Sequence, residues 1–166
     1  MIRRASVVVL ALLFGVPAAL AAPPALVILV RHAEKAALPA DNPPLTPAGR
    51  ERAAELARIV EVLSTDVPLR AIFSTDYVRT IETAKPLSQA SHVPVTVVKG
   101  DLAPRVLALA GGTVVIVGHS NTLPPIIEAL GGPSGIVIGD AEFNHLYVLA
   151  APGTTHAKLA ALAYGK

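Results

Sequence analysis

Two histidines follow two apolar runs of the chain in the same way. Arg31-His32 comes directly after residues 25–30, and Gly118-His119-Ser120 comes directly after residues 113–117. Both runs are short, β-branched and apolar on both faces, which is typical of strands buried within a parallel sheet. Open α/β sheets bind their ligands beyond the carboxyl ends of the strands. We therefore expect Arg31, His32 and His119 to converge where such a fold carries out its chemistry.

A third unit leads to a second arginine. Residues 71–73 predict a strand, residues 74–76 a turn and helix cap, and residues 77–84 have apolar spacing that fits a helix. This spacing places Arg79 in or near the first helical turn, where free N–H groups and the helix dipole favour anions. Arg31, Arg79, His32 and His119 would form a compact cationic pocket. The natural occupant of such a pocket is a phosphoryl group.

The elements that must position these residues alternate between strand and helix. Thr46 and Pro47 predict the start of a helix, and further helices are expected at 102–109 and 124–130. Residues 93–98 predict another strand, and residues 143–149 and 156–164 predict two late strands. This alternation indicates an α/β fold, a three-layer sandwich with a mostly parallel central sheet.

The N-terminus has the pattern of a secretory signal peptide. Arg3 and Arg4 precede an apolar segment, and small residues supply a cleavage site after Ala21 or Ala22. We expect residues 1–21 to be removed, residues 22–166 to form a single domain, and the protein to be periplasmic or secreted. The alternative is a membrane anchor, because no charge occurs from Ala5 to Val30. Three prolines interrupt that stretch, which favours cleavage over a stable membrane anchor.

The amino-acid composition limits the kinds of binding partner that we expect. The chain has 166 residues and no cysteine, so disulfides and a lipoprotein anchor are excluded. Removing Arg3 and Arg4 from its 14 basic residues leaves 12, equal to the 12 acidic ones. This balance, without a basic-aromatic patch, gives no support for nucleic-acid binding. We expect a small phosphorylated substrate as the partner.

Four blocks of sequence together carry a family resemblance. In order along the chain they are residues 30–35 (VRHAEK), 45–50 (LTPAGR), 74–84 (STDYVRTIETA) and 117–122 (VGHSNT). They resemble the histidine phosphatase (phosphoglycerate-mutase-like) superfamily, and the block after His119 is similar to its small phosphatase-type branch. One departure is Ala33, where the family has glycine. Alanine fits there unless the backbone needs a positive φ.

The resemblance implies a fold like that of phosphoglycerate mutase and a mechanism. His32 would attack phosphorus and hold the phosphoryl group as phosphohistidine, and water would then hydrolyse the P–N bond. The second ring nitrogen of His32 would donate a hydrogen bond to a backbone carbonyl, which would set the tautomer of the ring. Arg31, Arg79 and His119 would stabilise the charge on the equatorial oxygens. No cofactor and no metal are expected.

The remaining site residues have two readings each. Asp101, in the loop after the third strand, is the first choice for the general acid, but it also fits a helix N-cap. Glu34, two residues past His32, is the second choice and a candidate substrate-binding residue.

Ser120 and Asn121 could bind substrate or cap the following helix. Lys35 and Arg50 could lie at the edge of the site, and Arg79 could instead pair with Glu82 on the surface.

The leading hypothesis is an exported hydrolase of phosphoric monoesters, similar to the histidine acid phosphatases. A mutase-type phosphotransferase ranks lower, because the eleven residues between Asp101 and Thr113 leave little chain for a cap over a bisphosphorylated intermediate. A non-catalytic module that binds phosphorylated ligands stays as the alternative from another class. A metal site on His32 and His119 has no supporting ligand spacing.

Overall fold

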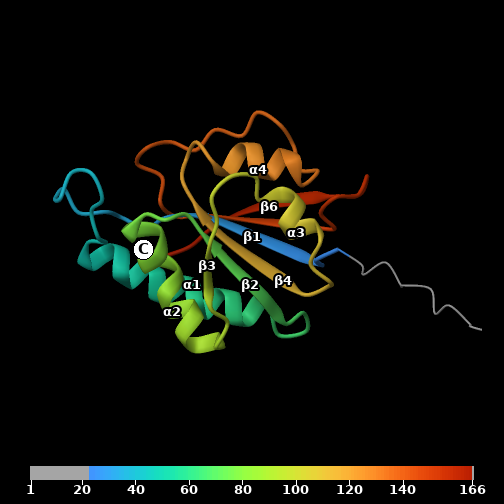
Figure 1. The fold of residues 1–166 in the computed structure, drawn as a ribbon, viewed down its shortest axis with the longest axis horizontal. Helices are drawn as coiled ribbons and strands as arrows, with labels where there is room; N and C mark the ends of the chain where they lie inside the picture. Colours follow the sequence, from blue (N-terminus) through green and yellow to red (C-terminus); the bar gives the residue numbers. More distant parts are fainter. Residues whose placement is uncertain (1–22, 166) are drawn as a thin grey trace, which may run out of the picture.

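The computed structural model describes residues 23–165, which form a six-stranded sheet with helices on both faces (Figure 1). The predicted signal peptide lies outside the described residues. The strand order is β3-β2-β4-β1-β5-β6, and β3, β2, β4 and β1 run parallel, whereas β5 is antiparallel to β1 and to β6. The strands are β1 (Leu26–Arg31), β2 (Leu69–Ser74), β3 (Val95–Val97), β4 (Thr113–Gly118), β5 (His145–Ala150) and β6 (Lys158–Ala163). The mostly parallel α/β sandwich is thus confirmed.

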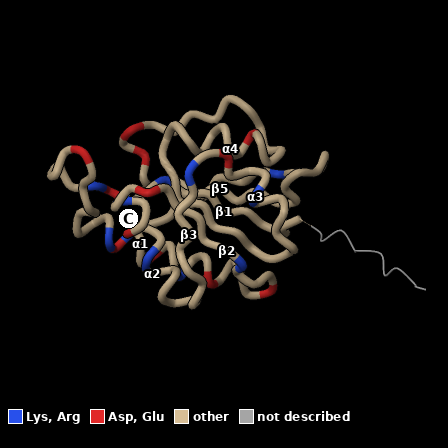
Figure 2. The backbone as a smooth tube through the Cα atoms, in the orientation of Figure 1, with Lys and Arg blue, Asp and Glu red and all other residues tan. Residues whose placement is uncertain are grey.

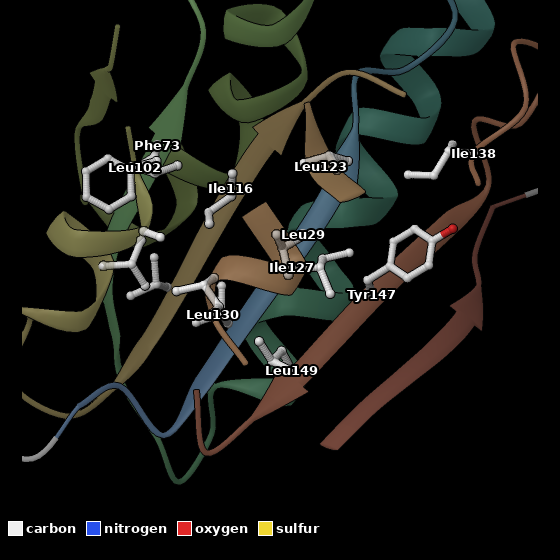
Figure 3. Close-up of a cluster of buried hydrophobic side chains, with 14 residues drawn as sticks. Leu29, Phe73, Leu102, Ile116, Leu123, Ile127, Leu130, Ile138, Tyr147 and Leu149 are labelled. Carbon is white, nitrogen blue, oxygen red and sulfur yellow. The ribbon is translucent and has the colours of Figure 1, made fainter. Parts of the chain in front are cut away.

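Alternate residues of the central strands supply two separate cores. On one face of β1, Val27 and Leu29 pack with residues of α3 (Ala103–Leu107) and α4 (Leu123–Ala129), including Leu123 (Figure 3). On the other face, Ile28 and Val30 pack with α1 (Pro47–Leu63) and α2 (Val78–Ser91). The two faces explain why these strands are continuously apolar, since each side chain is buried whichever way it points.

The predicted helices are present, with one correction at a cap. Thr46 caps α1 as expected, and its side chain accepts a hydrogen bond from the N–H of Gly49. Residues 74–76, however, do not cap α2: the N-cap position is Tyr77, without a side-chain cap bond. Instead, the N–H of Val78 donates to Oδ1 of Asn42 at 2.9 Å. A cap brought from a distant loop leaves no local sequence signal.

The register of β1 against β4 fixes the two catalytic candidates side by side. The strands pair from Leu26↔Thr113 to Arg31↔Gly118, and the N–H of His32 continues the ladder by donating to the carbonyl of Gly118 at 2.9 Å. His32 and His119 therefore leave adjacent strands at the same edge of the sheet.

Charged residues avoid the centre of the sheet and gather on helices and loops around it (Figure 2). Among residues 23–165, no helix combines the length and apolar character that a bilayer crossing requires.

Candidate active site

His32 is buried, and one of its ring nitrogens is occupied. Nδ1 lies 2.8 Å from the carbonyl oxygen of Ala33, which can only accept, so Nδ1 carries the proton and Nε2 holds the lone pair. Burial and the nearby charges of His119, Arg31 and Arg79 together lower the pKa of His32 to about 4, although the hydrogen bond to Ala33 acts in the opposite direction. At neutral pH this ring is therefore an uncharged nucleophile with a fixed tautomer. Ala33 does not adopt a positive φ, so the missing glycine causes no strain.

His119 lies against His32, with ring centroids 5.3 Å apart and the rings edge to face. Its Nε2 is 3.0 Å from the hydroxyl oxygen of Thr75. Burial lowers the pKa of His119 to about 4, with the charges of Arg79 and Arg31 acting in the same direction. Both histidines are thus neutral in the free protein at pH 7, and the positive charge of the site comes from the two arginines and from Lys35.

Arg31 is held by the segment before β5. Its Nη1 donates to the carbonyl of Gly139 at 2.6 Å and to the carbonyl of Glu142 at 3.3 Å. The guanidinium lies 4.3 Å from the centroid of the Phe143 ring, and that ring also packs against His32. The Nε of Arg31 is buried and has no hydrogen-bond partner among the described residues. A donor in that state is ready for an anion, because an unmet buried donor is costly.

Arg79 is in the same situation on the opposite wall. Its guanidinium stacks on the ring of Tyr77 at 4.1 Å, and its Nε is also buried without a partner in residues 23–165. The Tyr77 ring in turn meets His119 edge to face at 5.1 Å. The alternative of a surface ion pair with Glu82 does not occur, because the Glu82 carboxylate accepts the N–H of Leu45 at 2.7 Å.

These side chains surround a cavity of about 400 Å³, within the range of small-molecule sites. Ser120 and Asn121 line this cavity, and neither of them is the N-cap of α4, which is Thr122. This placement favours a role in substrate binding over a role in capping the helix. Lys35 also lines the cavity; Arg50 instead donates to the carbonyl of Leu45. The lining residues are Arg31, His32, Lys35, Tyr77, Arg79, His119, Ser120, Asn121 and Thr122.

The two candidate general acids do not line this cavity. Asp101 is exposed, and its Oδ1 accepts the N–H of Ala103 at 3.2 Å. This contact at the start of α3 resembles the helix cap that was the alternative to a general acid. Glu34 points toward α1, where Arg52 binds both carboxylate oxygens at 2.7–3.0 Å. Although burial raises the pKa of Glu34, the hydrogen bonds from Arg52 hold it below the usual value. A proton donor must hold its proton near neutral pH, and this environment favours the carboxylate.

Sequence reasoning missed the residues that hold the candidate catalytic side chains in place. Three of them are threonines of the third motif block: Thr75 contacts His119, Thr80 contacts Thr75, and Thr83 contacts the backbone of Arg79 and Ala33. Arg31 is held by Gly139, Glu142 and Phe143, from a segment with no motif. The two buried threonines one turn apart in residues 80–83 are the signal that could have been found. No group of three or more His, Cys, Asp or Glu side chains within residues 23–165 is arranged to hold a metal ion.

The strand order, the two neutral histidines and the two arginines define an α/β protein with a cationic cavity at the carboxyl ends of its parallel strands. Residues 27–100 match the family model of the histidine phosphatase superfamily (branch 1). This match confirms the resemblance carried by the first three motif blocks, and the block around His119 lies beyond it.

Solved structures share the fold. The SixA protein of Agrobacterium tumefaciens, described as a proposed phosphohistidine phosphatase, superposes with a TM-score of 0.60 at 24% identity and covers 86% of this chain and 99% of its own. The protein histidine phosphatase SixA complexed with tungstate gives 0.64 at 14% identity, over 83% and 96% of the two chains. A mycobacterial glucosyl-3-phosphoglycerate phosphatase with inorganic phosphate gives 0.57 at 14%, over 84% and 97%. No curated protein sequence matches the chain.

At these identities the structural likeness concerns the fold alone. The match to the family model, together with the cavity, supports a phosphatase of the hydrolase class.

Proposed function

We propose that this protein hydrolyses phosphoric monoesters through a phosphohistidine intermediate on His32. The observation that carries the proposal is the state of the His32 ring. Its Nδ1 proton is tied to the Ala33 carbonyl, and it lines a cavity together with two arginines whose buried Nε atoms have no partner among the described residues.

The steps follow from these groups. Arg31 and Arg79 bind the phosphoryl oxygens, and their two positive charges match a phosphoryl dianion. The lone pair on His32 Nε2 attacks phosphorus, the P–O bond to the leaving group breaks, and that oxygen departs with the electron pair. Water then attacks phosphorus, the P–N bond breaks, and His32 recovers its lone pair as inorganic phosphate forms.

The placement of the carboxylates indicates which kind of leaving group the site can release. Neither Asp101 nor Glu34 lines the cavity, and none of the described residues that line it carries a carboxyl group to protonate the departing oxygen. The site therefore suits phosphoryl donors whose leaving group is stable without a proton from the enzyme, such as aryl phosphates. Export to the periplasm or medium is part of the proposal and is supported by the sequence of residues 1–21.

The test is capture of the intermediate. The full-length protein is mixed with a radiolabelled aryl phosphate and quenched rapidly in alkali, in which phosphohistidine survives. We expect acid-labile label on the wild-type protein and none on His32→Asn, whose folding is checked by circular dichroism. Label that persists on His32→Asn would refute the assignment of the nucleophile, and turnover without any trapped label would favour direct attack by water.

A further inference from the structure

Two hydrogen-bonded hydroxyl groups, those of Thr75 and Thr80, connect His119 to the protein interior. The Oγ1 of Thr75 is 3.0 Å from Nε2 of His119 and 2.8 Å from Oγ1 of Thr80. Oγ1 of Thr80 also lies 2.8 Å from the carbonyl oxygen of Tyr77 and 3.2 Å from that of Thr75. Thr80 is fully buried, so its hydroxyl has no access to bulk water.

The number of protons available in this hydrogen-bond network determines which group donates in each contact. A threonine hydroxyl has one proton, and a carbonyl oxygen can only accept. Thr80 therefore donates its proton to a carbonyl, and its oxygen accepts the proton of Thr75. Thr75 then has no proton left for His119, so the remaining contact can form only if Nε2 of His119 donates.

We propose that Thr75 and Thr80 are positioning residues that hold neutral His119 in its Nε2–H tautomer, which makes Nδ1 the nitrogen that takes up a proton when a phosphoryl group binds. The phosphoryl ligand is the one part of this inference that rests on the proposed function. Nδ1 of His119 forms no hydrogen bond with residues 23–165, and the side chain lines the cavity. The proton comes from solvent and adds to the Nδ1 lone pair, after which Nδ1–H can donate to a phosphoryl oxygen.

The opposite tautomer would disrupt this hydrogen-bond network. A His119 ring with its proton on Nδ1 needs Thr75 to donate to Nε2. The contact between Thr75 and Thr80 would then need the proton of Thr80, and the Thr80 oxygen would face the carbonyl oxygen of Tyr77 at 2.8 Å with no proton between them. Since Thr80 is fully buried, no water can relieve this contact between two acceptors.

The charges around His119 explain why the proton arrives with the ligand. Arg79 from α2 and Arg31 from β1 oppose a further positive charge, His32 lies beside the ring, and Asp76 favours protonation. Asp76 is exposed and paired with Lys99 at 3.0 Å, which weakens its effect. Burial keeps the pKa of His119 low in the free protein. A bound dianion between the two arginines reverses the local balance and favours the imidazolium.

The test reads the tautomer directly and needs no turnover, so it can fail independently of the proposed function. The full-length protein is labelled with ¹⁵N-histidine, and two-bond ¹H–¹⁵N spectra are recorded at pH 7 without ligand. In the wild type we expect Nε2 of His119 to be protonated and Nδ1 to be bare. Thr75→Ser keeps the hydroxyl and should keep this pattern, whereas Thr75→Val should show a mixture of tautomers.

Thr80→Val gives the sharpest outcome, because Thr80 does not touch His119. Without its acceptor, the Thr75 hydroxyl becomes free to donate to Nε2, and the Nδ1–H population should rise about three- to tenfold. Wild-type His119 with its proton on Nδ1, or Thr75→Val with an unchanged tautomer ratio, would overturn the proposal. If Thr80→Val does not fold, the comparison of Thr75→Val with Thr75→Ser decides alone.

A second measurement follows the proton. Tungstate binding to the wild type, measured calorimetrically at pH 7 in buffers of different ionisation enthalpy, should show net proton uptake, and the ¹⁵N signal of His119 Nδ1 should become that of a protonated nitrogen. Tungstate binding with Nδ1 still bare would overturn the second half of the proposal.

Discussion

The hydroxyl oxygen of Thr83 accepts a hydrogen bond from the backbone N–H of Ala33 at 3.0 Å. The same hydroxyl donates to the carbonyl of Arg79 at 2.7 Å, and Thr83 is fully buried. The Ala33 carbonyl, on the other side of the same residue, accepts the Nδ1 proton of His32, so helix α2 fixes the backbone of the residue that orients the proposed nucleophile.

Replacing Thr83 should therefore lower turnover. Thr83→Val is nearly isosteric, but it leaves the Ala33 N–H without an acceptor, which costs about 1–3 kcal/mol. We expect kcat to fall about tenfold or more with a smaller change in KM, measured with an aryl phosphate. Thr83→Ser retains the hydroxyl and should stay within about threefold of the wild type. Equal losses for valine and serine would show that the methyl group, and not the hydrogen bond, matters.

Glu142 should control phosphoryl binding through Arg31. Its carboxylate accepts the N–H of Gly139 at 3.2 Å and so shapes the turn whose two carbonyls bind Arg31. We expect Glu142→Ala to weaken inhibition by tungstate about three- to tenfold, the value of one hydrogen bond.

Glu142→Gln is the matched control for this turn. Its amide oxygen can still accept from Gly139, and it removes a negative charge near Arg31, so the tungstate inhibition constant should be unchanged or lower. If Glu142→Gln weakened tungstate binding as much as Glu142→Ala, the charge and not the turn would be the operative feature.

Asp101→Asn should have little effect on either class of ester. Its carboxylate accepts the N–H of Ala103 at the start of α3 and does not line the cavity, so we expect less than about threefold change in kcat/KM for an aryl phosphate and for an alkyl phosphate. The ratio of the two changes separates catalysis from folding. A loss confined to the alkyl phosphate, about a hundredfold or more, would restore Asp101 as the general acid.

Acid should destabilise this protein through the two site histidines. Their pKa values are about 4 when folded, below the 6.5 typical of histidine, so the unfolded chain binds more protons between these limits. This contribution to stability is complete above pH 6.5 and is lost as the pH falls toward 4.

The loss can be measured by urea unfolding from pH 7 to pH 4.5. After allowance for the partial exposure of His119, we expect the free energy of unfolding to fall by about 2–4 kcal/mol. His32→Asn should remove about half of that dependence. An unchanged pH profile in His32→Asn would show that other groups cause it.

The sequence predicts this site well wherever a strand positions the residue. Arg31, His32 and His119 follow apolar runs whose pattern alone reveals buried parallel strands, and β1 and β4 do lie side by side. Asp101 shows the limit of the same reasoning. The loop after β3 places it near the correct end of the sheet, but the direction of its side chain depends on α3, whose N–H it meets.

The residues that orient the site depend on tertiary contacts that no local pattern records. Gly139 contacts Arg31 across 108 positions of sequence, and Asn42 caps a helix that begins 36 positions later. The position of Glu34 in the sequence suggests an acid beside His32. In the structure, helix α1 comes close enough for Arg52 to form an ion pair with the Glu34 carboxylate. That approach depends on Gly49, where a Cβ atom would meet the backbone of Glu34.

The pairing of β1 with β4 has a consequence for how this site can change. The separation of His32 and His119 is set by main-chain bonds between two central strands, and residues 36–42 take no part in that ladder. The loop follows Lys35, which lines the cavity, and it ends at Asn42, which caps α2. Residues 36–41 can therefore be exchanged without changing the strand pairing or this cap. A library randomised at 36–41, with Asn42 kept, should retain the proposed phosphohistidine chemistry while its members diverge in the esters they accept.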